Sequence, residues 1–233
     1  MINASVAIYL AFALLWLPYL AWKSTRRIGR SGPISIARRR FFSQVIGTQV
    51  FLLFVGGAMA YRNGIDVLRM PQQPLAAWSA AVLFLALILV TLRLRWSSRT
   101  PQDKLRLYSM LPHDSGELSL YAVVALSAGV AEEIAYRGVL TTLLTSVTGS
   151  LVIATVISAA AFAYVHLVQG WRAVFAIFII ALIAQAVVEL GHSLIPMMAV
   201  HAAYDLLAGI IVPRWYESAS ATTPIDAAPA PGQ

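Results

Sequence analysis

Seven long, largely apolar runs limit the fold more than any other feature of this sequence. They cover residues 3–22, 42–61, 77–94, 118–147, 149–169, 172–190 and 193–212. A helix needs roughly 20 apolar residues to cross a bilayer. Only 12% of the residues are charged, about half the level of a soluble domain. We therefore expect an all-α polytopic membrane protein with about seven transmembrane helices. The run 118–147 is too long for a simple span, so it either tilts or breaks near Gly138, which makes eight helices the alternative.

Basic residues lie between the apolar runs, and this placement predicts the topology. One loop holds Lys23, Arg26, Arg27, Arg30, Arg38, Arg39 and Arg40, and another holds Arg95, Arg99, Lys104 and Arg106. The positive-inside rule makes both loops cytoplasmic, with the N-terminus outside and the C-terminus inside. The net charge of +7 is therefore explained without a nucleic-acid partner. The short loops indicate a bacterial cytoplasmic membrane. With no cysteine in the chain, disulfides and thiolate catalysis are excluded.

The stretch AEEIAYRGVL, residues 131–140, places three charged side chains inside the fourth apolar run. Each charge at mid-membrane costs about 2.5–3.5 kcal/mol on insertion scales, so the three need partners. Glu133 and Arg137 are four residues apart, share a helix face and can form an ion pair. Glu132 projects about 100° away around the helix and lacks that partner. Glu133 with Arg137 is typical of a structural ion pair, whereas Glu132 is the candidate for acid–base chemistry.

Two later apolar runs carry histidines beside other polar or aromatic residues. FAYVH places Phe162 four residues before His166, and HAAYD places His201 four residues before Asp205. An aspartate at this spacing can accept from an imidazole N–H and fix its tautomer. A single histidine in a membrane helix more often forms an interhelical hydrogen bond than a catalytic site. In combination with Glu132, however, the two histidines can meet in one water-containing intramembrane cavity between three helices.

These residues, in this order, resemble the CPBP family of CAAX proteases and bacteriocin-processing proteins. The family is also called the ABI family of intramembrane glutamic endopeptidases. The motifs are E-E-x-x-x-R at Glu132 to Arg137, F-x-x-x-H at Phe162 to His166, and H-x-x-x-D at His201 to Asp205. The resemblance covers roughly residues 118–211, and the first three apolar runs carry no matching motif. One motif alone is weak, but three in order at family-like separations are fairly specific.

The resemblance implies a mechanism for four of these residues. Glu132 would be the general base that activates water, with help from His166. His201 and Asp205 would stabilise the oxyanion of the tetrahedral intermediate. The fold implied is all-helical, with a conical intramembrane cavity that opens to the cytosolic side in the eukaryotic prenyl-protein members.

The resemblance also assigns supporting residues and partners. Glu133 and Arg137 would shape the site, and Phe162 would pack beside it. The family's favoured mechanism requires no metal or other cofactor. The implied partners are a membrane-associated peptide or protein substrate and the lipid bilayer, with no nucleic acid.

Asp205 departs from the prenyl-protein proteases, which have asparagine at this position. An amide can donate a hydrogen bond to an oxyanion, whereas an ionised carboxylate would repel it. Asp205 must then be protonated, or else act by orienting His201. His201 is therefore a better candidate than Asp205 for stabilising the oxyanion.

Three other functions stay open at this point. The first is a zinc peptidase that uses His166, His201 and a carboxylate, since zinc accepts three such ligands plus water. The chain lacks H-E-x-x-H, so this hypothesis depends on long-range geometry alone. The second is a non-proteolytic immunity or scaffold protein of the same fold. The third is a transporter with a carboxylate–histidine relay.

The sequence divides into three segments under this interpretation. Residues 1–112 form N-terminal transmembrane helices with basic cytoplasmic loops, and residues 113–215 form the catalytic helical core. Residues 216–233, rich in alanine, proline and threonine, are expected to be a disordered tail. Within the core, Glu132 lies mid-helix while His166 lies near the cytoplasmic end of its run. Either a tilted fourth helix or run boundaries shifted by a few residues would bring them together.

Overall fold

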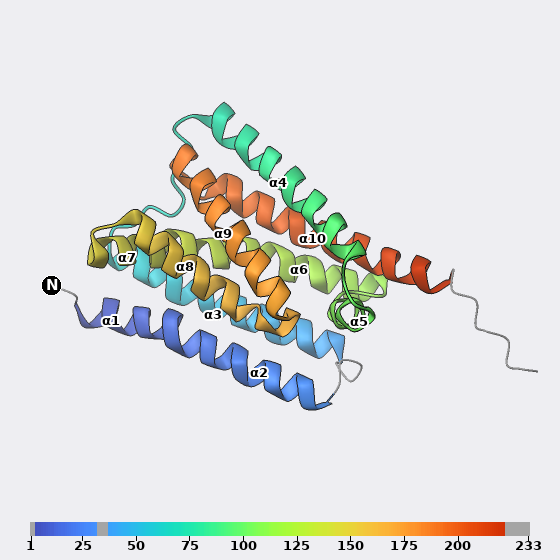
Figure 1. The fold of residues 1–233 in the computed structure, drawn as a ribbon. Helices are drawn as coiled ribbons and strands as arrows, with labels where there is room; N and C mark the ends of the chain where they lie inside the picture. The colour runs from blue at the N-terminus through green and yellow to red at the C-terminus, as the bar shows by residue number, and fades with distance from the viewer. Residues whose placement is uncertain (1–2, 32–36, 222–233) are drawn as a thin grey trace, which may run out of the picture.

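The fold is all-helical, as predicted. The computed structural model describes residues 3–31 and 37–221, and in these ranges it contains helices and connecting segments but no strand (Figure 1). Six of the described helical segments are long and apolar enough to cross a membrane: Ala4–Arg27, Arg38–Arg62, Pro74–Ser97, Ser115–Thr148, Trp171–Gly191 and Ile195–Ala219. Large apolar side chains such as Leu83 and Phe175 are exposed on the outer surface, which suits contact with lipid.

The structure divides the chain into thirteen helical segments within the described residues. In order they are α1 (Ala4–Ala11), the π-helical η1 (Phe12–Trp16), α2 (Leu17–Ser31), α3 (Arg38–Arg62), α4 (Pro74–Ser97), α5 (Pro101–Ser109), α6 (Ser115–Glu132), the π-helical η3 (Glu133–Leu140), α7 (Thr141–Thr148), α8 (Leu151–Val165), the 3₁₀ turn η4 (Leu167–Gln169), α9 (Trp171–Gly191) and α10 (Ile195–Ala221). Three of them, α6, η3 and α7, form one continuous rod of 34 residues.

The predicted count of seven or eight spans is not confirmed. The difference lies in the run 149–169, which forms α8, a helix of only 15 residues. At about 1.5 Å per residue such a helix is roughly 22 Å long, shorter than the roughly 30 Å hydrocarbon core. The chain also does not break near Gly138, because η3 continues directly into α7.

The predicted tail is partly helical. α10 continues to Ala221, so it includes residues 216–221 of the segment expected to be disordered. The remaining part, residues 222–233, lies outside the described residues.

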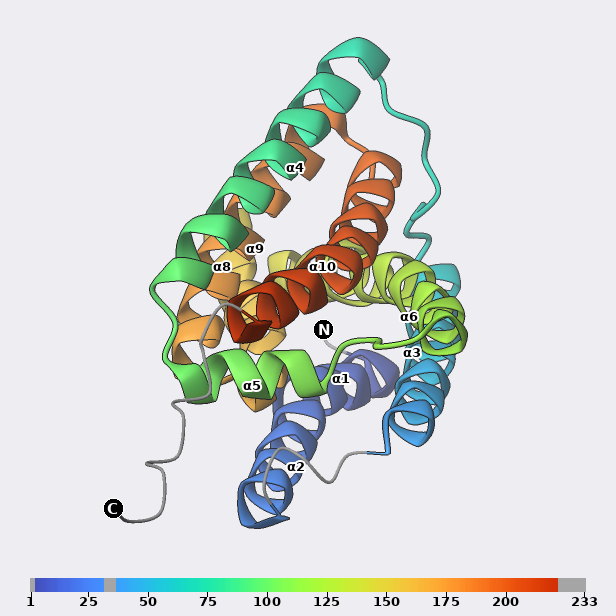
Figure 2. The same ribbon diagram turned by 90° about the vertical axis from the view of Figure 1, so that its right-hand side faces the viewer.

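Both predicted basic loops lie at one end of the bundle. The end of α2, the start of α3, the end of α4, α5 and the start of α6 all gather there (Figure 1, right). Viewed from this end, α10 lies in the middle, with α3 and α6 on one side and α4, α9 and α8 on the other (Figure 2). The cytoplasmic orientation of this end stays a prediction.

The start of α6 is anchored at this end by polar contacts. Asp114 is the N-cap and accepts from the backbone N–H of Glu117 at 2.7 Å. This hydrogen bond holds the pKa of the exposed Asp114 carboxyl below its usual value. Arg38 of α3 donates to the buried Glu117 carboxylate at 2.8 Å, and the backbone N–H of His113 donates to the same oxygen. The contact ties α3 to α6.

A glycine allows α6 and α10 to pack closely. A Cβ at Gly129 would lie 2.8 Å from Ala202 Cβ, Ala202 N and Met198 O. Two of these three atoms are backbone, so α10 cannot yield by moving a side chain. Small residues permit this kind of backbone approach between membrane helices. Because Gly129 is one turn before Glu132 and Glu133, the close crossing of the two helices places these carboxylates near α10.

We expect Gly129→Ala to destabilise the protein by about 1–3 kcal/mol, because the added methyl overpacks the crossing of α6 and α10. The matched control is Gly57→Ala in α3, where an added Cβ meets nothing within 4 Å. That change should leave stability unchanged or raise it by up to about 1 kcal/mol through helix propensity. Unfolding of the purified protein in detergent, titrated with SDS, measures both. Equal stability of the two variants would contradict the close-packing argument.

Candidate active site

The predicted carboxylates lie where α6 changes into the π-helical segment η3. Glu132 is the last residue of α6 and Glu133 the first of η3. Two carbonyl oxygens of η3 accept hydrogen bonds from side chains of other helices. Tyr9 of α1 donates to Ala135 O at 2.8 Å, and Ser158 of α8 donates to Tyr136 O at 2.9 Å. Short π segments of this kind occur often at functional sites.

Glu133 is fully buried and contacts two other residues of the site. Its Oε1 accepts from Arg137 Nη1 at 2.5 Å, which is the ion pair that the spacing predicts. The same oxygen lies 2.8 Å from His201 Nδ1 on α10. A carboxylate oxygen accepts, so the imidazole N–H is on Nδ1. Glu133 therefore does more than neutralise Arg137, because it also sets the orientation of His201.

The Glu132 carboxylate accepts a hydrogen bond from a side-chain amide on α3 that belongs to none of the three motifs. Gln49 of α3 donates through Nε2 to Glu132 Oε1 at 2.6 Å. The second oxygen, Oε2, is buried without a hydrogen-bond partner and lies 3.7 Å from His201 Nε2. One oxygen is thus fixed and the other faces the imidazole. Gln49 is a polar residue inside the apolar run 42–61, which is the signal that could have found it.

His201 and Asp205 share a face of α10 but are not hydrogen-bonded to each other. His201 Nε2 and Asp205 Oδ2 are 3.7 Å apart, too far for a hydrogen bond of normal length. The expectation that Asp205 fixes the tautomer of His201 is therefore not met in this structure, where Glu133 makes that contact. Asp205 instead faces the Nε2 edge of the ring, together with Glu132 Oε2.

His166 is at the C-terminal end of α8, and Phe162 stands between it and His201. His166 Nδ1 donates to Phe162 O at 2.8 Å, because a carbonyl can only accept. In the neutral imidazole this leaves Nε2 as the acceptor. The Phe162 ring lies 4.8 Å from the His166 ring and 6.2 Å, edge-on, from the His201 ring. Arg137 lies over the same ring, with Cζ 4.8 Å from its centroid.

The structure therefore brings the predicted residues into one region but not into one hydrogen-bonded cluster. Glu133, Arg137 and His201 are directly hydrogen-bonded at the α6–α10 crossing, and Glu132 Oε2 and Asp205 Oδ2 each lie 3.7 Å from His201 Nε2. His166 contacts Phe162, and it is close enough to Asp205 for an electrostatic interaction. Among residues 3–31 and 37–221, no three histidine, aspartate or glutamate side chains are arranged as a metal-binding group.

Comparison with known proteins identifies the part of the chain that carries this site. Residues 114–207 match the family model described as type II CAAX prenyl endopeptidase Rce1-like. The match begins at the N-cap of α6 and includes every residue of the three motifs. No curated protein matches the chain, and no solved structure does.

The family match agrees with the family predicted from the three motifs. Together with the six apolar helices, it shows an integral membrane protein. The predicted resemblance to the CAAX proteases is confirmed. Residues 114–207 are therefore similar to the type II CAAX prenyl endopeptidase Rce1-like family.

Proposed function

We propose that the protein is an intramembrane endopeptidase in which Glu132 activates the water that cleaves a peptide bond. The family match supports CAAX endopeptidase activity in general. The observation that carries the specific assignment is Glu132 Oε2, a buried carboxylate oxygen without a hydrogen-bond partner, 3.7 Å from His201 Nε2. Because Gln49 holds the other oxygen, Oε2 has a defined direction and is free to take a proton.

Hydrolysis would proceed in two steps. In the first, Glu132 Oε2 takes a proton from water while the water oxygen bonds to the carbonyl carbon of the substrate. His166 Nε2, left as an acceptor by the bond at Nδ1, would hold the second water proton. In the second step, the tetrahedral intermediate collapses, the C–N bond breaks, and the proton on Glu132 passes to the leaving amine.

His201 is the proposed donor to the oxyanion of that intermediate. For this role its Nε2 carries a proton, while Nδ1 donates to Glu133. Asp205, 3.7 Å from the same Nε2, would hold the ring edge toward the reacting carbonyl. Such contacts shorten in many enzymes only once substrate binds. Glu133, Arg137 and Phe162 would keep the imidazole in place.

The substrate would be a membrane-associated peptide or protein. The bond to be cleaved must reach a site between α6 and α10, inside the apolar part of the bundle. By the positive-inside rule, the basic end of the bundle would face the cytoplasm of a bacterial cell, with the N-terminus outside and the C-terminus inside. Residues 113–215 would then form the catalytic core, and the preceding helices would complete the bundle, with Gln49 as their contribution to the site.

A rescue experiment tests the proposed function. The gene is deleted in its host and restored either as wild type or as Glu132→Gln, and protein termini in the membrane fraction are compared by mass spectrometry. We expect wild type to restore particular cleaved termini and Glu132→Gln not to, at equal membrane abundance. If both restore the same termini and phenotype, a non-proteolytic immunity or scaffold function becomes the better explanation. Metal content and chelator sensitivity of the purified protein test the zinc peptidase alternative.

A further inference from the structure

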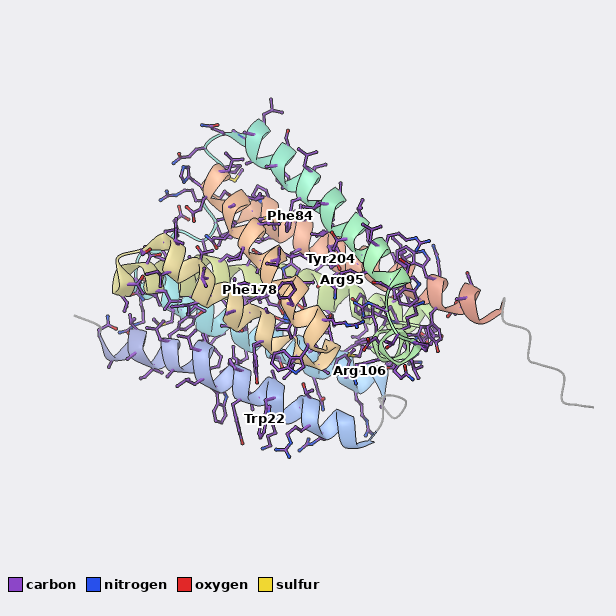
Figure 3. All side chains as sticks on the ribbon, in the orientation of Figure 1. Trp22, Phe84, Arg95, Arg106, Phe178 and Tyr204 are labelled. Carbon is purple, nitrogen blue, oxygen red and sulfur yellow. The ribbon has the colours of Figure 1, made fainter. Side chains whose placement is uncertain are left out.

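A cavity lined by arginines lies apart from the catalytic residues, at the basic end of the bundle. Its volume is about 380 Å³, within the range of small-molecule sites. Four arginines from three elements and a turn line it: Arg95 at the end of α4, Arg99 in the following turn, Arg106 on α5 and Arg172 at the start of α9. Figure 3 shows Arg95, near Tyr204 of α10, and Arg106 further toward α2.

The cavity has an excess of positive charge that the described protein does not balance. Asp103 is the only acidic residue in the lining, so the formal charge of the lining is +3. Within residues 3–31 and 37–221, none of the four arginines forms an ion pair with a carboxylate at 4.0 Å or less. Like charges gathered in a partly buried cavity repel each other, so the arrangement favours an anionic ligand.

Two of the arginines form few hydrogen bonds in the described structure. Arg95 donates to a single backbone oxygen, that of Arg172, at 3.1 Å. The Nε of Arg99 is buried and has no hydrogen-bond partner. Burial, followed by the nearby charge of Arg95, lowers the pKa of Arg99, although a guanidinium stays charged in proteins. A bound anion would supply acceptors to both groups.

Backbone geometry adds to the positive character of the cavity. Gly170 precedes α9 with φ +94°, a backbone conformation that favours glycine, and it provides no side-chain cap. A Cβ at Gly170 would lie 3.5 Å from Arg106 Nη1, so this guanidinium lies directly over the start of α9. Free backbone N–H groups and the helix dipole at a helix N-terminus both favour an anion.

The surroundings of the cavity resemble a membrane–water interface. Trp171, which also lines the cavity, is 65% exposed, and tryptophan is enriched at headgroup level. Phe175, one turn further along α9, and Leu94, beside Arg95, are exposed apolar residues. A ligand with its anionic group in the cavity could therefore place a hydrocarbon chain along α9 and α4. Basic pockets between helices on the cytoplasmic side bind phospholipid headgroups in other membrane proteins.

We propose that this arginine cavity is a binding site for the phosphate headgroup of an anionic phospholipid. The planar guanidinium groups match a phosphate in bidentate hydrogen bonds. The α9 N-terminus would contribute backbone donors, and the acyl chains would lie on the exposed apolar faces of α4 and α9.

Native mass spectrometry of the purified, delipidated protein tests the site. Phosphatidylglycerol is added and compared with phosphatidylcholine of the same acyl chains, with and without inorganic phosphate as competitor. The pocket variant is Arg99→Gln/Arg106→Gln. The matched control is Lys23→Gln/Arg40→Gln, which removes the same charge from two exposed positions at the same end. Ser98→Asp adds a negative charge to the lining and keeps every arginine. It replaces the double variant in the test if the double variant does not fold.

We expect wild type and the control variant to bind phosphatidylglycerol more tightly than phosphatidylcholine. The pocket variant should bind phosphatidylglycerol about tenfold more weakly or worse, because charge-assisted hydrogen bonds are lost. Ser98→Asp should weaken binding to a similar extent, because its carboxylate repels the phosphate. Equal weakening in the pocket and control variants would overturn the proposal and indicate attraction by net charge alone. Competition by inorganic phosphate at concentrations equal to the lipid would also overturn it, since the cavity would then be a soluble-phosphate site. Absence of any preference for phosphatidylglycerol in wild type would do the same.

Discussion

Glu132→Gln is expected to lower the rate of peptide hydrolysis about 100- to 10,000-fold, the range typical for loss of a general base. The substitution keeps the volume of the side chain and a carbonyl oxygen that can still accept from Gln49 Nε2. It removes the carboxylate oxygen that lies 3.7 Å from His201 Nε2 and would take the proton from water. The fold should therefore persist while the chemistry is lost. The rate is measured on a peptide that spans the cleavage site identified by the comparison of membrane-protein termini.

The chain offers a closely matched control in Glu189→Gln. Glu189, on α9, also accepts from a glutamine amide, that of Gln185, at 2.8 Å. The two substitutions thus remove the same charge from the same kind of glutamine–glutamate pair. Glu189→Gln should retain the wild-type rate because Glu189 does not contact the proposed catalytic residues. Equal loss of activity in both variants, or none in Glu132→Gln, would refute the assignment of Glu132 as base.

Arg137→Gln is expected to destabilise the protein by about 3–5 kcal/mol, the usual cost of removing one partner of a buried ion pair. Glu133 is fully buried and Arg137 is 7% exposed, so water cannot replace the lost guanidinium. The Glu133 carboxylate would keep only the His201 imidazole as a partner. The loss is measured as a shift of the SDS-induced unfolding transition in detergent.

The double variant Glu133→Gln/Arg137→Gln distinguishes an unpaired charge from lost packing. It removes both charges and leaves two amides that can bond to each other. If the destabilisation of Arg137→Gln comes from the uncompensated carboxylate, the double variant should recover a large part of the lost stability. A double variant as unstable as Arg137→Gln would show instead that the contact of Arg137 with the Phe162 ring, or the size of the side chain, is the main contribution.

Local sequence features predicted the parts of the structure that depend on spacing alone. Hydrophobic length located the spans, and the i,i+4 rule predicted the Glu133–Arg137 pair that the structure contains. The span predicted for the run 149–169 is not confirmed, because α8 is only 15 residues long. Propensity does not show where a turn and a 3₁₀ segment will end such a helix.

The contacts that orient the site could not be read from spacing because their partners are far apart in the chain. Gln49 and Glu132 are 83 residues apart, and His201 and Glu133 are 68 apart. Sequence proximity favoured Asp205 as the partner of His201, since both lie on one face of α10. The structure places Glu133 closer to Nδ1 instead, because Gly129 lets α10 approach α6.

The sequence by itself therefore determined the all-helical membrane fold, the resemblance of residues 114–207 to the CAAX proteases, and which polar residues need partners inside the bundle. Each of these follows from residue type and from distances along one helix. Only the tertiary structure decided which carboxylate holds His201, that an amide of α3 holds Glu132, and that four arginines converge on one cavity. These depend on how closely separate helices cross, which is set by packing between residues distant in the chain rather than by any local pattern.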